Sequence, residues 1–248
     1  MNRVILVFFI LYYYTVLTSF AQVKNIRDYY KNAEKANKTQ PFQVSFVQKQ
    51  MGLVDNHEKL KQIILIRHGE PALKKEGWVK REEAKQFIYA YDTVGIYDSK
   101  FKSASITDDE VTVIHTSSLN RARHTAKFLF GEEKNYLNDT LFREFERKIA
   151  ALPNLKLPLK TWLVTSRILW MMGMNKKNIE SFSEAKRRAK RATSRLEQLT
   201  DENGKVVLVA HGFLNRYLIK NLKKRDWKVV RKGGKGYFAT WLLVQYEE

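Results

Sequence analysis

Cysteine is absent from the 248-residue sequence. Its absence excludes a disulfide framework, a thiolate zinc site and a cysteine nucleophile. Because cysteine usage is the usual sequence indicator of redox compartment, the compartment has to be inferred from other features. The histidines therefore carry more weight as candidates for chemistry. There are five: His57, His68, His115, His124 and His211.

Acidic residues are scarce relative to basic ones. The sequence has 26 Asp and Glu against 45 Lys and Arg, which gives a formal net charge of +19. An excess of this size favours an anionic partner, such as a phosphate group, a nucleic acid or a lipid surface. The composition, 44% hydrophobic and 29% charged, excludes disordered and collagen-like classes and fits a globular protein with a large core.

The N-terminus has the pattern of a secretory signal peptide over residues 1–21. Arg3 precedes an apolar run over residues 4–20, and the small residues Ser19 and Ala21 stand three and one before a cleavage point at Gln22. The alternative is an uncleaved segment that anchors the protein to a membrane through residues 4–20. Both interpretations predict export, to the periplasm or the medium.

Residues 22–60 read as a polar, lysine-rich N-terminal extension, with one short edge strand where Phe42, Val44 and Phe46 alternate. From residue 61 to 248, three units combine a short apolar run with a helical pattern. The predicted strands are 63–66, 111–114 and 206–209, and the predicted helices carry apolar faces over 84–91, 119–129 and 182–199. The third helix starts at a capping box formed by Ser181 and Glu184.

Continuous apolar runs suit strands that are buried on both faces, so we expect an α/β fold. The alternation of strands and helices predicts a three-layer α/β/α sandwich with a mainly parallel sheet, completed by a last strand over 238–246. Residues 147–178, rich in Trp and Met around Arg167, are predicted to form a helical cap insertion. A peripheral helix that completes the core, or a helix on a membrane surface, are the alternatives for this segment.

Two histidines directly follow predicted buried strands. His68 follows the strand that ends at Arg67, and His211 follows the strand that ends at Ala210; a glycine comes after each histidine. Because the carboxyl ends of parallel strands converge on one crevice, these side chains are expected to face one another. Burial of Arg67 without an anion would be costly, so the sequence predicts an anion site there.

Three segments around these residues resemble the motifs of the histidine phosphatase superfamily, which has the phosphoglycerate mutase-like fold. Residues 65–70, Leu-Ile-Arg-His-Gly-Glu, resemble the first motif of that family. Residues 117–126, Ser-Ser-Leu-Asn-Arg-Ala-Arg-His-Thr-Ala, are similar to its second arginine motif, and residues 209–212, Val-Ala-His-Gly, to its second histidine motif. They occur in the family's order and in the strand-to-turn context assigned above.

The resemblance implies that His68 attacks phosphorus and becomes a phosphohistidine, while Arg67, Arg121 and His211 surround the phosphoryl oxygens. It implies neither a metal nor another cofactor. A carboxylate is also needed as proton donor, and Glu144 is the preferred candidate because Arg143-Glu144 matches the pair in the phosphatase branch; Glu146 is the alternative. The family's usual glycine and tryptophan-glutamate-glycine run does not follow, and residues 147–153 stand in its place.

These features together predict an exported, metal-independent phosphomonoester hydrolase that acts on a phosphorylated small molecule. A mutase-type phosphotransferase, a protein phosphohistidine phosphatase and an inactive phosphate-binding protein remain alternatives. A further alternative, a protein that binds nucleic acid or the envelope surface, is supported only by the net positive charge. The basic residues over 186–195 and 223–235 are interpreted as solvated faces, since no nucleic-acid-binding module is visible and no specific nucleic acid is expected as partner.

Overall fold

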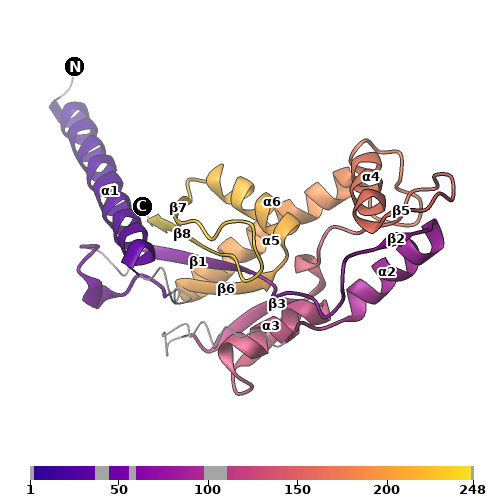
Figure 1. Ribbon diagram of the computed structural model, residues 1–248. Coiled ribbons are helices and arrows are strands. Elements are labelled where there is room, and N and C mark those ends of the chain that lie inside the picture. The colour runs from indigo at the N-terminus through magenta and orange to yellow at the C-terminus, as the bar shows by residue number, and fades with distance from the viewer. Residues whose placement is uncertain (1–2, 37–44, 56–59, 98–110, 247–248) are drawn as a thin grey trace.

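The computed structural model describes residues 3–36, 45–55, 60–97 and 111–246, and its core is a six-stranded sheet in the order β4-β3-β6-β1-β8-β7 (Figure 1). The strands are β1 (Leu60–Arg67), β3 (Val113–Ser117), β4 (Asn135–Asp139), β6 (Lys205–Ala210), β7 (Lys228–Arg231) and β8 (Thr240–Tyr246). β4, β3, β6 and β1 pair in parallel, whereas β8 runs antiparallel to both β1 and β7. The predicted mainly parallel sheet is confirmed.

Helices cover both faces of this sheet. Successive side chains of a strand point to opposite faces, so the continuous apolar runs of the central strands place apolar side chains on both faces, and both need to be covered. Ile64 and Ile66 of β1 pack in one cluster with α1 (Arg3–Ala36) and α3 (Asn120–Phe130). Ile63 and Leu65 pack in a second cluster with α5 (Phe182–Asn203) and α6 (Gly212–Lys223). Burial of β1 on both faces explains its continuous apolar sequence and produces the predicted three-layer sandwich.

The ends of α5 follow from its sequence. Ser181 Oγ accepts a hydrogen bond from the backbone N–H of Glu184, and the Glu184 carboxylate accepts from the N–H of Ser181, as the predicted capping box requires. Gly204 ends the helix in the left-handed conformation, with a φ of 69°. Together these two ends fix the position from which β6 begins.

A smaller unit lies beyond the strand ends and contains the segment predicted as a cap (Figure 1). β2 (Trp78–Val79) pairs with β5 (Leu157–Pro158), and α2 (Arg81–Thr93) packs against α4 (Leu159–Met171). Their own apolar cluster centres on Trp162. This unit therefore has two parts that are far apart in the sequence, of which only residues 147–178 were predicted as a cap. Trp170, near the end of α4, packs into the α5 and α6 cluster and joins this unit to the sheet domain.

Part of the N-terminal extension over residues 22–60 is packed in the core, which the sequence did not predict. α1 continues without interruption past Ala21 to Ala36, and its residues Val23, Ile26 and Tyr30 are buried in the core. Phe42 and Val44 of the predicted edge strand lie outside the described residues, and residues 45–48 form no strand.

Phe46 and Val47 are nevertheless buried, because the Gln62 side chain provides the hydrogen bonds that a strand would otherwise give. Its amide bonds both the N–H and the C=O of Val47, at 2.8 and 2.9 Å. Two short 3-10 helices, η1 (Lys49–Met51) and η3 (Thr140–Phe142), complete the described elements. Within the described ranges, no helix combines the length and the apolar character needed to cross a membrane.

Candidate active site

A cavity of about 680 Å³ opens at the carboxyl ends of β1 and β6, between α6 and the cap. Six cationic side chains line it: Arg67, Arg121, Arg147, Arg167, Arg216 and Lys235. Glu144 is the only carboxylate among its described lining residues. The cavity thus contains four of the five predicted site residues, and the fifth, His211, lies beneath it against His68.

One ring nitrogen of His68 forms a hydrogen bond to the backbone, and the other is left with a free lone pair. Its Nδ1 lies 2.7 Å from the carbonyl oxygen of Gly69, and since a carbonyl only accepts, Nδ1 carries the proton and Nε2 keeps its lone pair. The ring is 3% exposed. Burial and the positive charge of Arg121, with further effects of Arg67 and Arg147, lower the pKa of His68 to about 3, although the bond to Gly69 opposes this shift. A neutral imidazole of this kind is a competent nucleophile.

His211 lies next to His68, with 5.1 Å between the ring centroids. Its Nε2 is 2.7 Å from the hydroxyl of Ser117 at the end of β3, and its Nδ1 has no partner among the described residues. Complete burial, followed by the charge of Arg121, lowers the pKa of His211 well below its ordinary value. The sheet topology therefore brings together the two histidines whose proximity the sequence predicted.

Arg67 and Arg121 flank the histidines and are held by different contacts. Arg67 donates a hydrogen bond to the carbonyl of Lys235, and its guanidinium lies 4.7 Å from the centroid of the Tyr237 ring. Arg121 is 1% exposed and bonds the carbonyl of Tyr91 at 2.8 Å and the carboxylate of Asp92 at 3.1 Å. The Nε atoms of both arginines have no partner within the described ranges. Two forked donors therefore remain for an anion.

Gly212 is required where α6 begins beside Arg67. A Cβ atom at this position would lie 3.0 Å from Arg67 Nε and 3.2 Å from its Cδ. Glycine therefore lets the backbone of α6 approach this arginine closely. The glycine after the second histidine has a packing role at the site.

The two candidate proton donors lie in different surroundings. Glu144 lines the cavity, and its carboxylate accepts hydrogen bonds from the backbone N–H groups of Phe213 and Leu214, at 3.2 and 3.0 Å, in the first turn of α6. Glu146 is exposed, does not line this cavity, and accepts a hydrogen bond from the N–H of Glu180 at 2.6 Å. Position therefore favours Glu144 for contact with a ligand.

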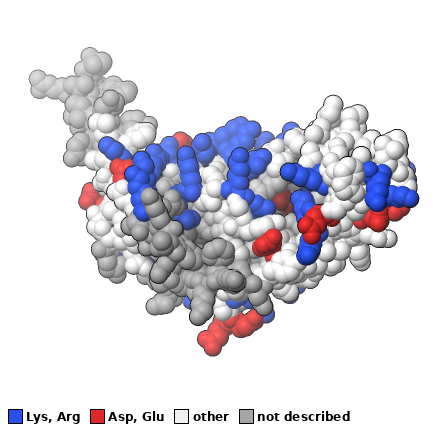
Figure 2. Space-filling model, viewed as in Figure 1, with Lys and Arg blue, Asp and Glu red and all other residues white. Residues whose placement is uncertain are grey.

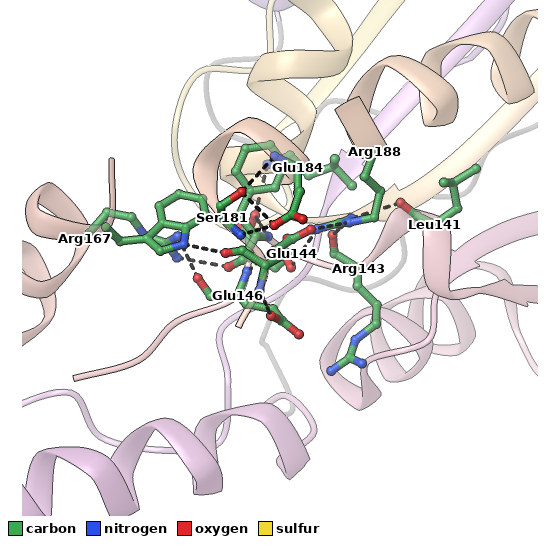
Figure 3. A network of polar contacts seen from close by, with 12 residues as sticks. Leu141, Arg143, Glu144, Glu146, Arg167, Ser181, Glu184 and Arg188 are labelled. Carbon is green, nitrogen blue, oxygen red and sulfur yellow. Dashed lines mark hydrogen bonds and ion pairs between the residues drawn. The ribbon is translucent and has the colours of Figure 1, made fainter. Parts of the chain in front are cut away.

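Two arginines fix the backbone on either side of Glu144 (Figure 3). Arg188 donates to the carbonyls of Leu141, Arg143 and Glu144 at 3.1, 2.7 and 3.4 Å. Arg167 donates to the next two carbonyls, those of Phe145 and Glu146, at 3.0 and 2.9 Å.

This network corrects the interpretation of residues 186–195 as a wholly solvated face. The Arg188 side chain is 14% exposed and forms an ion pair with Glu180. Its guanidinium is largely shielded from solvent, where it satisfies the carbonyl of Leu141 in η3 and two carbonyls of the irregular segment that follows.

Sequence reasoning missed part of the cavity. Arg147 stands where the chain departs from the family pattern, and that departure was its only signal. Arg216 belongs to no motif, and only the fold shows that it lies near Phe213. Tyr237, which lies under Arg67 outside the cavity lining, was missed for the same reason. Neither His115 nor His124 is among the described residues that line the cavity.

Comparison with known protein families matches residues 63–247 to the histidine phosphatase superfamily (branch 1). A search of curated proteins gave no match. Among solved structures, a mycobacterial glucosyl-3-phosphoglycerate phosphatase is similar at 20% identity, over 75% of this chain and 90% of that chain, with a TM-score of 0.44. A phosphoserine phosphatase variant from Entamoeba histolytica in complex with phosphoserine is similar at 16% identity, over 75% and 95% of the two chains, with a TM-score of 0.42.

The family match covers β1 through β8, and it includes the strand ends that hold Arg67, His68 and His211 as well as the start of α3 that holds Arg121. The sheet order and the layers agree with the α/β fold expected from the three motifs. The chain therefore belongs to the histidine phosphatase superfamily.

Proposed function

We propose that the protein hydrolyses phosphomonoesters through a phosphohistidine formed on His68. The observation that carries this proposal is the state of the His68 ring, which is neutral, has Nδ1 bonded to the Gly69 carbonyl, and lies beside Arg67 and Arg121. An imidazole with its proton on the far nitrogen can attack phosphorus without the help of a separate base. The two arginines can neutralise charge on the transferred group.

In the first step, His68 Nε2 forms a bond to phosphorus as the bond from phosphorus to the ester oxygen breaks. Glu144, in its carboxylic acid form, gives its proton to the leaving oxygen. In the second step, a water molecule attacks the phosphohistidine, Glu144 takes a proton from that water, and inorganic phosphate leaves. His68 and protonated Glu144 are thereby restored. Hydrogen bonds from Phe213 and Leu214 hold the carboxyl group during both steps.

Release of inorganic phosphate from p-nitrophenyl phosphate by the purified protein tests this activity directly. A mutase-type phosphotransferase would instead transfer the group to a bound acceptor and release little phosphate. An inactive phosphate-binding protein would release none. Lys and Arg gather over β7 and α6 in the view of Figure 2, and such a surface attracts anionic substrates, so a falling kcat/KM with rising salt is consistent with the proposal.

Chelation of divalent metal ions should leave the phosphatase activity unchanged. No group of three His, Cys, Asp or Glu side chains within the described ranges could hold a metal ion, and a cation entering the cavity would meet six cationic side chains. Activity on p-nitrophenyl phosphate is measured before and after treatment with EDTA. Loss in EDTA with recovery on addition of a divalent ion would contradict the proposed chemistry.

We also propose that the protein is exported. Arg3, the apolar run over residues 4–20 and the pair Ser19 and Ala21 support cleavage before Gln22. N-terminal sequencing of protein recovered from the cell envelope or the medium should therefore begin at or near Gln22. An intact N-terminus in the membrane fraction would support the anchor instead, and intact protein in the cytosol would contradict export.

A further inference from the structure

The cavity contains more positive charge than one phosphoryl group requires. Its described lining has six cationic side chains and one carboxylate, and Asp92, which is paired with Arg121, adds a second acidic group at its edge. A phosphomonoester dianion bound at His68 would use Arg67 and Arg121. Four of the six would then remain for a second anion: Lys235, whose carbonyl bonds Arg67, and three side chains of the cap and α6, Arg147, Arg167 and Arg216.

Four of the five arginines that line the cavity lie in two pairs, each near one aromatic ring, and the fifth, Arg67, lies near Tyr237. The guanidiniums of Arg121 and Arg147 lie 4.6 and 5.5 Å from the centroid of the Tyr91 ring. Those of Arg167 and Arg216 lie 5.4 and 5.6 Å from the centroid of the Phe213 ring. Arg121 belongs to the phosphoryl site, and Arg147 shares the Tyr91 ring with it. The charge of Arg147 also acts on Arg167 of the second pair, so Arg147 lies between the two groups.

The three remaining arginines are held as cations with little compensation. Arg147 and Arg216 have no hydrogen bond or ion pair with any described residue, and Arg216 is exposed. Arg167 is bonded to two carbonyls; burial and the nearby charge of Arg147 lower its pKa to about 10, so it stays charged at neutral pH. Like charges held together in a partly buried cavity repel one another, and a bound anion relieves this repulsion.

Asn215 provides a second, independent observation in the same cavity. It lies on the first turn of α6, lines the cavity and is 4% exposed. Neither its side-chain oxygen nor its side-chain nitrogen has a partner in the described part of the chain. Buried amide groups are normally hydrogen-bonded, so this one points to a polar ligand in the cavity.

We propose that Arg147, Arg167, Arg216 and Asn215 form a second anion subsite, and that the substrates are phosphomonoesters that carry a second anionic group, a carboxylate or a second phosphate. This inference rests on the proposed phosphatase activity. The Phe213 ring, which lies close to both Arg167 and Arg216, lines the cavity beside this subsite and offers an apolar surface to the substrate. Arginine suits this subsite because its planar fork pairs with both carboxylate and phosphate.

A homologous series of substrates tests the subsite. Linear ω-phosphonooxy carboxylic acids with two to six carbons are compared with their neutral primary amides and with the α,ω-diol bisphosphates of the same lengths. At the best chain length, kcat/KM for the carboxylic acid or for the bisphosphate should exceed kcat/KM for the neutral amide by about tenfold or more. The comparison of carboxylates with bisphosphates identifies the preferred second anion.

Variants of the subsite should remove this preference. In Arg216→Gln and in Arg147→Gln, the ratio of kcat/KM for the acid to that for the amide should fall towards one, mainly through KM. Lys220→Gln is the matched control, because Lys220 is an exposed cation on the same helix that does not line the cavity. It should keep the wild-type ratio.

Two results separate this inference from the proposed function. If monoesters are hydrolysed but the acid-to-amide ratio is near one, or does not change in either arginine variant, the subsite is wrong and the phosphatase assignment stands. Calorimetry with the His68→Ala variant measures the affinities for the corresponding non-hydrolysable phosphonates. The ratio of the affinity for the phosphonocarboxylate to that for the phosphonoamide reports on the subsite without catalysis. Equal affinity for phosphonocarboxylates and phosphonoamides would overturn the subsite even if no ester is hydrolysed.

Discussion

Replacement of His68 by Ala should abolish both turnover and the covalent phosphoenzyme. In the wild type, rapid quenching with labelled phosphomonoester should trap a phosphoprotein that is labile in acid and stable in base, the behaviour of a phosphoramidate at a histidine nitrogen. His68 is the only histidine among the described residues that line the cavity, and its Nε2 keeps a lone pair because Nδ1 is bonded to the Gly69 carbonyl; the variant lacks this nitrogen. We expect turnover to fall by at least about a thousandfold, because nucleophilic attack has no substitute at this position.

Two controls distinguish loss of the nucleophile from loss of the fold. His68→Asn retains a hydrogen-bond donor for the Gly69 carbonyl, so its thermal stability should be closer to that of the wild type than the stability of His68→Ala is. It should nevertheless be inactive. His124→Ala removes an exposed histidine outside the cavity and should keep both label and turnover. Label retained in His68→Ala would place the nucleophile elsewhere.

The lowered pKa of His68 adds a pH criterion to the same experiment. An ordinary histidine, with a pKa near 6.5, is mostly protonated at pH 5 and cannot attack. Because the pKa of His68 is lowered to about 3, its ring stays neutral at pH 5. Formation of the phosphoenzyme from p-nitrophenyl phosphate should therefore persist at pH 5. A loss of labelling centred near pH 6.5 would mean that the nucleophile is an unperturbed histidine.

The sequence predicted β1, β3, β6 and β8 and the helices α3 and α5 of the sheet domain, because these elements depend on local patterns, but it did not predict β4, β7 or α6. Ile63 to Ile66 are apolar without interruption because β1 is buried on both faces, and Ser181 with Glu184 marks the start of α5 through hydrogen bonds within four residues. Strand ends also made it possible to predict that His68 and His211 lie together, since parallel strands converge at one edge.

The burial of the N-terminal extension was not predicted, for a different reason. The segment after residue 22 is polar overall, yet Val23, Ile26 and Tyr30 are spaced by three and four and pack as one helical face against the sheet. That spacing was present in the sequence, but three apolar residues among many lysines gave a weak signal. The contact of Phe46 and Val47 with Gln62 could not be predicted, because it depends on a side-chain amide on β1.

The cationic lining of the cavity was not predictable from spacing. Arg147 lies in a loop, Arg167 on α4 and Arg216 on α6, and they come together only because the cap folds over the start of α6. Arg188 is a similar case, since its partners lie 44 to 47 residues away in the sequence. Long-range contacts of this kind leave no periodic pattern, so they appear only with the fold.

Replacement of Glu144 by Gln should affect substrates according to their leaving groups. Gln is nearly isosteric and can still accept a hydrogen bond from the N–H of Phe213 or Leu214, so the start of α6 should remain in place. An alkoxide needs a proton as its bond to phosphorus breaks, whereas nitrophenolate is stable without one. We therefore expect phosphorylation by alkyl phosphates to fall by about a hundredfold or more relative to phosphorylation by p-nitrophenyl phosphate.

The same carboxylate is proposed to activate water in the second step, which gives Glu144→Gln a kinetic signature. With p-nitrophenyl phosphate, phosphorylation of His68 should remain fast while hydrolysis of the phosphohistidine becomes slow. Stopped-flow measurement should then show a burst of nitrophenolate equal to the enzyme concentration, followed by slow turnover. Glu146→Gln is the matched control: Glu146 bonds the N–H of Glu180 outside the cavity, so this variant should show neither the leaving-group effect nor the burst. Equal losses on both substrates without a burst would instead assign Glu144 a structural role at the start of α6, and a burst in Glu146→Gln would transfer the proton-donor role to that residue.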